Sequence, residues 1–250
     1  MNSKGVLLVT GGGRGIGAAV ARGAAAQGWD VAINAVRDLG SAQAVAESVQ
    51  ALGRRAIAVQ ADVADEAAVE AMFERVDREL GVLRGLVNNA GVVDIAQRVD
   101  DMSLARWQRM FAINVQGTFL CTRAALRRMS TRHGGTGGSI VNLSSAAARL
   151  GSPGQYVDYA AAKAAIDTFT LGVAREVATE GVRINAVRPG IIDTEIHASG
   201  GQPDRVQRMA PQVPMQRAGT AEEVAQAVLW LLSDQAAYTT ASVLDVAGGR

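Results

Sequence analysis

The sequence predicts an α/β protein with a doubly wound, seven-stranded parallel sheet and helices on both faces. Short runs of β-branched and aliphatic residues alternate with helical patterns along the chain, which is the rhythm of successive βαβ units. Parallel neighbours require crossover helices, and these cover both faces of the sheet. With 250 residues, 48% of them hydrophobic, and no linker, the chain can bury one large core. We therefore expect a single domain spanning 1–250.

Strands are predicted where the apolar runs are short and β-branched, and helices where apolar residues recur with helical spacing. The predicted strands are 6–10, 31–35, 56–60, 86–89, 140–143, 183–187 and 242–246. The predicted helices are 16–27, 41–52, 65–80, 103–130, 159–180 and 221–233. Three of these helices begin with a residue that is favoured as an N-cap, namely Ser41, Asp65 and Ser103.

Several polar residues follow predicted strands directly. Ligands of doubly wound sheets bind beyond the carboxyl ends of the strands, so Asp62, Asn89 and Ser145 are expected at one shared edge. The segment 191–213 breaks the alternation and is rich in glycine and proline. Loops of this length in compact domains are often lids, and we expect this one to cover the substrate.

Composition favours a small-molecule protein. The net charge of +1 gives no electrostatic reason to expect nucleic acid or an anionic membrane as a partner. No apolar run approaches a bilayer span, and the first strand starts too early for a signal peptide, so a cytoplasmic location is expected. The single cysteine, Cys121, lies in an apolar run and excludes an internal disulfide. His197 has no partner histidine at metal spacing, so we predict no metal; it either touches substrate or is an exposed loop residue without a role.

A glycine-rich turn, Thr-Gly-Gly-Gly-Arg-Gly-Ile-Gly at 10–17, joins the first strand to the first helix. Glycines let backbone N–H groups approach a pyrophosphate, which also lies at the positive end of the helix dipole. Such a turn can also be purely structural, so taken alone it is a weak signal. Between a strand and a helix it predicts a dinucleotide site.

Tyr159 and Lys163 are four residues apart on a predicted helix, which places the phenol and the ammonium on one face. A phenol has a pKa of about 10 and a nearby cation favours phenolate, so the pair supplies a proton donor and acceptor. Tyr156 has alanine four residues on and lacks this arrangement. Upstream, a strand runs into Ser144 and Ser145, of which only one can point into the site because successive strand residues face opposite sides.

Five motifs now occur in the order of the short-chain dehydrogenase/reductase family, and the chain resembles that family over essentially its whole length. The motifs are the glycine turn with Gly11, Gly15 and Gly17; Asn-Asn-Ala-Gly at 88–91; Asn114; Ser145 with Tyr159 and Lys163; and Pro-Gly-Ile-Ile-Asp-Thr at 189–194. The resemblance is to the group containing 3-oxoacyl carrier-protein reductases and glucose 1-dehydrogenase-like enzymes. It implies a Rossmann fold and an oxidoreductase that interconverts a carbonyl and a secondary alcohol.

The resemblance also implies roles for individual residues. Tyr159 is the general acid or base, Lys163 lowers its pKa and holds the nicotinamide ribose, Ser145 orients the carbonyl, and Asn114 anchors a water that relays protons to Lys163. Asn89 and Asp62 are implied in the adenosine pocket, and Ile192 and Thr194 at the nicotinamide carboxamide. The residues expected to contact the cofactor are Gly11, Gly13, Arg14, Gly15, Ile16, Gly17, Arg37, Asp62, Val63, Asn89, Ala90, Gly91, Tyr159, Lys163, Pro189, Gly190, Ile192 and Thr194.

Charge at the end of the second strand favours NADP(H) over NAD(H). An NAD site places an acid there to bind the ribose 2′-OH, and this chain has Ala35. Arg14 and Arg37 can both reach a 2′-phosphate, for which the guanidinium fork is suited. The alternative is that both arginines are simply solvated.

Two departures from the family pattern stand out. The loop at 154–159 is one residue longer than usual, which leaves Ser144 as an alternative to the preferred Ser145; Ala247 stands where the family often has aspartate. By resemblance we expect a homotetramer. The apolar face of the last helix, Val224, Val228, Leu231 and Leu232, supports it only in part because much of that face should pack on the sheet.

Two other functions are possible readings of the sequence. A regulator that binds NADP(H) without turnover is disfavoured by the intact Asn114, Ser145, Tyr159 and Lys163. A nucleic-acid-binding Rossmann protein is disfavoured by the near-zero net charge.

Overall fold

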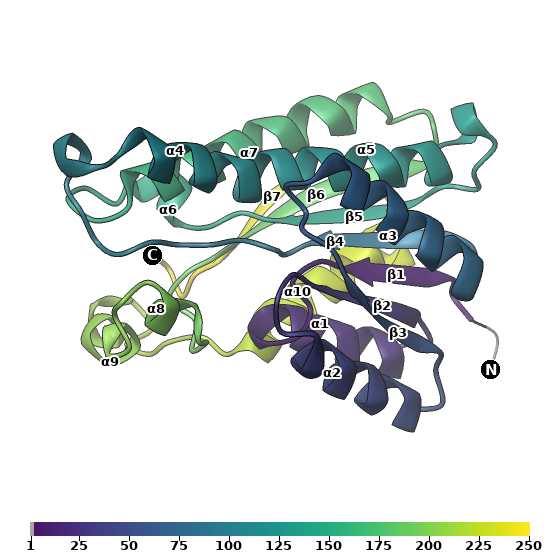
Figure 1. Cartoon of the computed structure of the whole chain (residues 1–250), viewed down its shortest axis with the longest axis horizontal. Helices are drawn as coiled ribbons and strands as arrows, with labels where there is room; N and C mark the ends of the chain where they lie inside the picture. Colours follow the sequence, from purple (N-terminus) through teal and green to yellow (C-terminus); the bar gives the residue numbers. More distant parts are fainter. Residues whose placement is uncertain (1–2) are drawn as a thin grey trace.

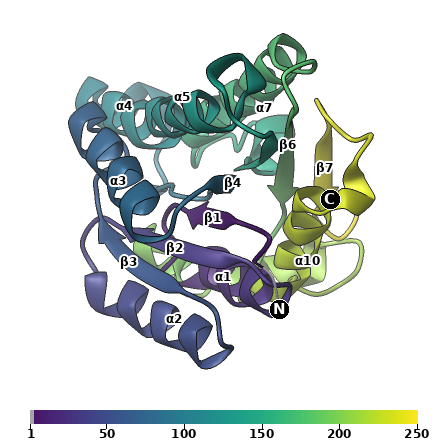
Figure 2. The same ribbon diagram turned by 90° about the vertical axis from the view of Figure 1, so that its right-hand side faces the viewer.

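The computed structural model describes residues 3–250, and in these residues seven strands form one parallel sheet. The strands are β1 (Val6–Val9), β2 (Asp30–Ala35), β3 (Ala56–Gln60), β4 (Leu83–Asn88), β5 (Gly138–Leu143), β6 (Val182–Pro189) and β7 (Val243–Val246). Their order across the sheet is β3-β2-β1-β4-β5-β6-β7, and Figure 2 shows the sheet twisting between its two edges. From β1 the sheet is extended through β2 to β3 on one side and through β4 to β7 on the other. The switch point where such folds bind ligands therefore lies between the neighbouring strands β1 and β4.

Helices cover both faces of the sheet, as predicted. The described helices are α1 (Gly15–Ala26), α2 (Leu39–Ala51), α3 (Glu66–Glu79), α4 (Leu104–Phe111), α5 (Gly117–Met129), α6 (Ala147–Leu150), α7 (Val157–Glu176), α8 (Ile196–Ser199), α9 (Arg205–Met209) and α10 (Ala221–Leu232). In Figure 1, α1, α2 and α10 lie on one side of the sheet and α3, α5 and α7 on the other. Short turns complete the chain: η1 (Val99–Asp101), η2 (Ala112–Gln116), η3 (Thr131–His133), η4 (Ala210–Gln212) and η5 (Asp234–Ala236).

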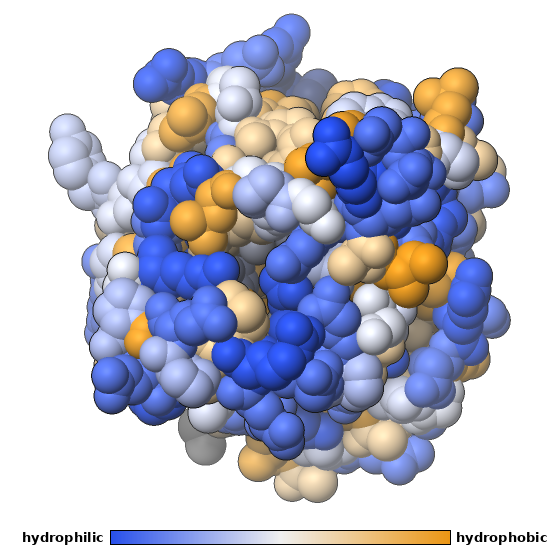
Figure 3. Space-filling model, turned by 90° about the vertical axis from the view of Figure 1, so that its left-hand side faces the viewer, coloured by the Kyte–Doolittle hydropathy of each residue, from blue (hydrophilic) through white to orange (hydrophobic). Residues whose placement is uncertain are grey.

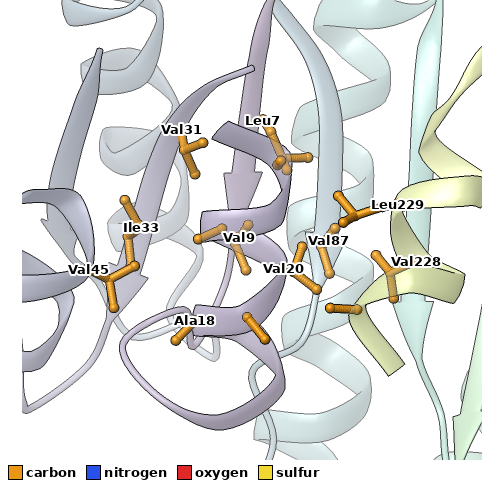
Figure 4. Packing of buried hydrophobic residues seen from close by; sticks show 14 of the residues in the cluster. Leu7, Val9, Ala18, Val20, Val31, Ile33, Val45, Val87, Val228 and Leu229 are labelled. Carbon is orange, nitrogen blue, oxygen red and sulfur yellow. The ribbon is translucent and has the colours of Figure 1, made fainter. Parts of the chain in front are cut away.

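The two faces of the sheet carry separate apolar cores. Leu7 and Val9 of β1 pack in the core under α1 and α10, whereas Val6 and Leu8 pack in the opposite core. Figure 4 shows the first core, where Val9 lies between the sheet and Val20 of α1. Because all of β1 is buried on both faces, its sequence is a continuous apolar run rather than an alternating one.

Several predicted helix boundaries are corrected by the structure. The helix predicted from Ser41 begins at Leu39, since the carboxylate of Asp38 accepts a hydrogen bond from Ser41 N at 2.9 Å and acts as the N-cap. Asp65 and Ser103 are N-caps, as predicted. The long helix predicted at 103–130 is divided into α4 and α5 by the π-helical turn η2.

The segment 191–213 contains α8, α9 and η4 rather than an irregular loop. In Figure 1 these elements project beyond the end of the sheet where the strands point. An isolated bridge between Ile192 and Gly219 ties the start of the segment to the chain that leads into α10. The segment therefore lies at the carboxyl edge of the sheet, and its role as a lid stays a prediction.

Candidate active site

A cavity of about 420 Å³ lies at the carboxyl edge of the sheet. Figure 3 faces this end of the molecule and shows hydrophilic side chains over most of it, with apolar patches between them. The predicted site residues that line the cavity are Ile16, Asn89, Gly91, Ser145, Tyr159, Lys163, Pro189, Gly190, Ile192 and Thr194. The fold therefore brings together motifs that are spread over most of the chain.

The glycine turn is packed so closely that side chains are excluded from it. Gly11 has a φ of +59°, and a Cβ on it would lie 3.0 Å from the Cα of Ala90. A Cβ on Gly17 would lie 2.6 Å from Nδ2 of Asn89. Asn89 Nδ2 donates to the carbonyl oxygens of Thr10 and Gly11, both at 2.9 Å. Asn89, predicted for the adenosine pocket, thus stabilises the turn and also lines the cavity.

Two buried polar residues that the sequence analysis did not single out support the same turn. Thr10 Oγ1 accepts hydrogen bonds from the backbone N–H groups of Asn89 and Ala90, both at 3.0 Å. Asn34 Oδ1 accepts one from Gly11 N at 3.2 Å. Each is a polar residue directly after a run of apolar strand residues. That position in the sequence could have indicated their role.

The N-terminus of α1 faces the turn without a capping side chain. Its N-cap residue, Arg14, makes no side-chain cap hydrogen bond, and the first turn of α1 contains no acidic residue. The first N–H groups of a helix need acceptors, and the helix dipole favours an anion there. Gly15, with a φ of +50°, lies against Thr194, so the segment after β6 closes over this end.

Tyr159 and Lys163 lie on α7, with Lys163 Nζ 5.6 Å from the centre of the Tyr159 ring. Lys163 is only 4% exposed and Nζ donates to the carbonyl oxygen of Leu143 at 2.7 Å. Burial lowers the pKa of Lys163 to about 8, and the charge of Asp167 acts in the opposite direction.

The phenol is perturbed differently from the sequence expectation. Burial raises the pKa of Tyr159, and a hydrogen bond with the Ser145 side chain opposes that shift. The hydrogen bond with Ser145 thus favours the phenolate, and the ammonium of Lys163 donates to a backbone carbonyl close by.

The two serines after β5 both line the cavity, but they make different contacts with α7. Ser144 is buried, and its hydroxyl donates to the carbonyl oxygen of Lys163 at 3.1 Å. Ser145 is the serine that meets Tyr159, and its Oγ also accepts a hydrogen bond from Ala147 N at 3.1 Å. The geometry selects Ser145 over the alternative Ser144.

Asn114 lies in the π-helical turn η2 and is fully buried. Its Nδ2 donates to the carbonyl oxygens of Val92 and Met110 at 3.1 and 3.0 Å, and its Oδ1 accepts from Val92 N at 3.2 Å. A Cβ on Gly91 would lie 2.7 Å from that oxygen and 3.5 Å from Lys163 Nζ. The absence of a side chain at Gly91 thus leaves Asn114 and Lys163 close to each other. The π-helical turn that holds Asn114 is of a type that is common at functional sites.

Apart from Asn89, the residues predicted for the adenosine end do not line this cavity. Asp62 is exposed after β3, where its Oδ1 accepts from Ala64 N at 2.9 Å, and Val63 is buried against Gly117. Arg14 and Arg37 are exposed. Within the described residues no hydrogen bond or ion pair joins the Arg37 guanidinium to a partner.

Gly13 in the glycine turn and Ala247 near the C-terminus both lie in close backbone contacts. A Cβ on Gly13 would lie 3.1 Å from Ala42 N, so the turn packs against the start of α2. Ala247, which departs from the family pattern, is buried against Gly190.

A buried ion pair beside the tyrosine was not predicted from the sequence. Arg106 Nε donates to Asp158 Oδ2 at 2.8 Å and Nη2 donates to Oδ1 at 3.2 Å. Asp158 Oδ1 also accepts from Tyr159 N at 2.9 Å, and Arg106 Nη1 donates to the carbonyl oxygen of Ile95 at 2.7 Å. The pair fixes the start of α7 to the chain at 95–97. The ion pair joins residues 52 positions apart, so no local sequence pattern predicts it.

The described residues hold no group of three or more His, Cys, Asp or Glu side chains placed to bind a metal. The side chain of His197 lies outside the part of the chain that is described. Cys121 is buried, and burial raises the pKa of its thiol to about 12. Among the helices described, none combines the length and apolar character that crossing a bilayer requires.

Comparisons with known proteins extend over nearly the whole chain. A family model described as "Enoyl-(Acyl carrier protein) reductase" matches residues 11–250. The chain is 52% identical over 245 residues to an uncharacterized oxidoreductase of Escherichia coli, covering 98% of this chain and 99% of that one. It is 40% identical to 2-(S)-hydroxypropyl-CoM dehydrogenase 3 of Xanthobacter autotrophicus, covering 98% and 95%. A crystal structure of a short chain dehydrogenase from Burkholderia cenocepacia in complex with NADP matches with a TM-score of 0.90 and 36% identity, covering 99% and 98%.

Proposed function

The chain belongs to the short-chain dehydrogenase/reductase family of oxidoreductases acting on CH–OH and C=O groups, and from that premise we propose an NADP(H)-dependent enzyme with Tyr159 as its general acid or base. Its reaction interconverts a carbonyl and a secondary alcohol. The observation that carries the proposal is the meeting of Ser145, Tyr159 and Lys163 in one cavity beside the glycine turn. A silent NADP(H)-binding regulator would not need this set of proton-handling groups.

The residues at the carboxyl edge fit a dinucleotide. The uncapped N–H groups at the start of α1 are suited to a pyrophosphate, and the turn is kept bare because a Cβ on Gly17 would collide with Asn89. Thr194 lies against Gly15, which places the segment after β6 at the same end. When bound, the nicotinamide supplies or accepts the hydride at C4.

The preference for NADP(H) rests on charge at the end of β2. Asp38 is the acid nearest in sequence to the end of β2. Its carboxylate accepts hydrogen bonds from both N and Oγ of Ser41 and caps α2. Arg14 and Arg37 are exposed, and a 2′-phosphate offers a guanidinium a strong acceptor. The Burkholderia relative, whose structure contains NADP, supports this assignment.

The proton chemistry belongs to the side chains of the cavity. In the reducing direction Tyr159 Oη donates its proton to the oxygen of the former carbonyl, and in the oxidising direction it accepts the proton of the alcohol. Ser145, next to the phenol, holds the same oxygen by a hydrogen bond. Lys163 keeps a positive charge nearby below about pH 8, and Asn114 lies beside it as the link to a proton-relaying water.

Tyr159→Phe tests the proposal directly. A panel of carbonyls and alcohols is first screened by the absorbance of the reduced nicotinamide. On the best substrate, the variant is expected to lose about 10²–10⁴-fold in kcat, because the ring keeps its packing and loses only the proton. NADPH affinity, measured by fluorescence titration, should stay nearly unchanged.

The matched control is Tyr238→Phe, which removes a phenol hydroxyl from a fully exposed position and should keep full activity. If Tyr159→Phe retains more than about a tenth of the wild-type kcat, another group donates the proton. If the wild-type protein binds NADPH but turns over nothing in the panel, the regulator is the better reading.

A further inference from the structure

Arg205, the first residue of α9, lines the active-site cavity together with Ser145 and Tyr159. Its Nη1 donates to Gln155 Oε1 at 2.8 Å and to Gln202 Oε1 at 3.0 Å. These contacts hold the guanidinium in a defined place on the cavity wall.

An aromatic ring completes the support of Arg205. The guanidinium carbon lies 5.1 Å from the centre of the Tyr156 ring, and Gln202 Nε2 donates to Tyr156 Oη at 2.6 Å. All the groups that position Arg205 are therefore neutral. They orient the guanidinium but leave its charge uncompensated.

Among the described residues, the side chains that line the cavity include no carboxylate. Arg250 lines the same cavity. Burial lowers the pKa of Arg205 most, Tyr156 opposes this shift, and the positive charges of Arg250 and Arg208 lower the pKa further.

Neighbouring arginines show what ordinary pairing looks like in this protein. Arg208, one turn along α9, forms an ion pair with Asp204 at 2.8 Å. Arg106, which is more buried than Arg205, has the carboxylate of Asp158. Arg205, by contrast, lines the cavity and is hydrogen-bonded to glutamine side chains rather than to a carboxylate.

We propose that the substrate carries an anionic group, a carboxylate, sulfonate or phosphate, which Arg205 binds while the carbonyl lies at Ser145 and Tyr159. This inference rests on the proposed function and narrows its substrate class. The planar guanidinium fork of Arg205 matches such oxyanions. Leu150, Ile196 and Met209, which also line the cavity, fit the carbon chain between the two ends of the substrate.

The experiment compares each anionic ketone with a neutral counterpart of related structure. The carboxylate arm uses 3-oxobutanoate, 4-oxopentanoate and 5-oxohexanoate, each with its methyl ester. The phosphate arm uses dihydroxyacetone phosphate and dihydroxyacetone, and the sulfonate arm uses acetonylsulfonate and acetonyl methyl sulfone. Each is assayed with NADPH on the wild-type protein, Arg205→Gln, Arg205→Lys and the control Arg78→Gln, which removes the same charge from an exposed position on α3.

For the preferred anion, Arg205→Gln is expected to lower kcat/KM by about ten- to a hundredfold, which is the loss of one charge-assisted contact. The neutral partner should change by less than about threefold, and the KM for NADPH should not move. Arg205→Lys should restore part of the loss because it restores the charge without the fork. Arg78→Gln should match the wild-type protein throughout.

Failure of this inference and failure of the proposed function give different results. Equal turnover of anionic and neutral ketones, unaffected by Arg205→Gln, overturns the anion site and leaves the reductase standing. A raised KM for NADPH in Arg205→Gln, with unchanged ketone selectivity, assigns Arg205 to the cofactor instead and also overturns it.

If no ketone in any arm is reduced, the same anions are titrated calorimetrically into the NADP⁺-treated protein. Binding that is lost in Arg205→Gln supports the anion site while the proposed function fails. Absence of binding overturns the anion site as well.

Discussion

Asp158 is fully buried beside Tyr159, with its carboxylate held by Arg106 and by the backbone N–H of Tyr159. The hydrogen bonds that Arg106 donates to Asp158 raise the pKa of Arg106, which keeps the guanidinium charged. A buried pair of this kind adds little net stability, but removing one partner leaves the other charge buried alone. Its value here is geometric, because it holds the start of α7 against 95–97.

Arg106→Leu is therefore expected to lower the free energy of unfolding by about 3–5 kcal/mol, measured by urea denaturation. The double variant Arg106→Leu/Asp158→Leu should recover much of this loss, since it buries no unpaired charge. Arg78→Gln, which removes an exposed cation, serves as the control. A loss below about 1 kcal/mol in Arg106→Leu would show that Asp158 finds another partner or stays hydrated.

The proposed preference for NADP(H) leads to a second prediction at the residue scale, for Arg37. Arg37→Glu replaces an exposed cation with an acid beside the end of β2, so it should repel a 2′-phosphate. We expect kcat/KM for NADPH to fall by about ten- to a hundredfold and the value for NADH to change little. Steady-state kinetics with both cofactors measure this, with Arg78→Glu as the control for net charge. Wild-type protein that uses NADH at least as efficiently as NADPH contradicts the assignment.

At the scale of elements, the segment 191–213 is built from short helices. Its helices α8 and α9 have four and five residues, and helices this short are not stable on their own. The contacts that anchor α9 are side-chain hydrogen bonds to Gln155 and Tyr156 rather than a buried apolar face. Local opening of such a segment costs little free energy.

Amide hydrogen exchange followed by mass spectrometry should therefore be fast in 191–213 and slow down on addition of NADP⁺, because closure over the cofactor adds contacts. The amides of α5 provide the internal control and should exchange slowly under both conditions. Slow exchange in 191–213 before NADP⁺ is added, with no change afterwards, would rule out a lid.

At the scale of the whole molecule, the structure corrects the sequence argument for oligomerisation. Val224, Val228, Leu231 and Leu232 of α10 are at most 5% exposed and pack on the sheet of their own chain, so they are not free to form an interface. Exposed apolar groups toward the same end of the chain include Trp230 and Leu244, at 39% and 37% exposure. Leu244 lies on β7, an edge strand of the described sheet.

The homotetramer expected by family resemblance remains a prediction. Light scattering at micromolar concentration should give four times the 25.9 kDa chain mass. Leu244→Asp should shift the protein to smaller species if the β7 edge is an interface, whereas Leu52→Asp on the distant end of α2 should not. A monomeric mass for the wild-type protein contradicts the prediction.

Local patterns in the sequence were sufficient to predict the seven strands, the helices on both faces and the glycine turn, because side-chain periodicity and turn chemistry act over a few residues. They also placed Tyr159 and Lys163 on one helix face, since that relation is a four-residue spacing. Helix starts were less certain, as Asp38 shows, because several residues of cap type compete within one turn.

Only the tertiary structure selected Ser145 over Ser144, turned Lys163 toward Leu143 and raised the pKa of the phenol. It alone joined Arg106 to Asp158 and placed Arg205 in the cavity beside Gln155, 50 residues away in the chain. These features depend on burial and on contacts between distant segments. Burial exists only once the layers are packed, so no pattern along the chain can encode which distant polar group will meet which.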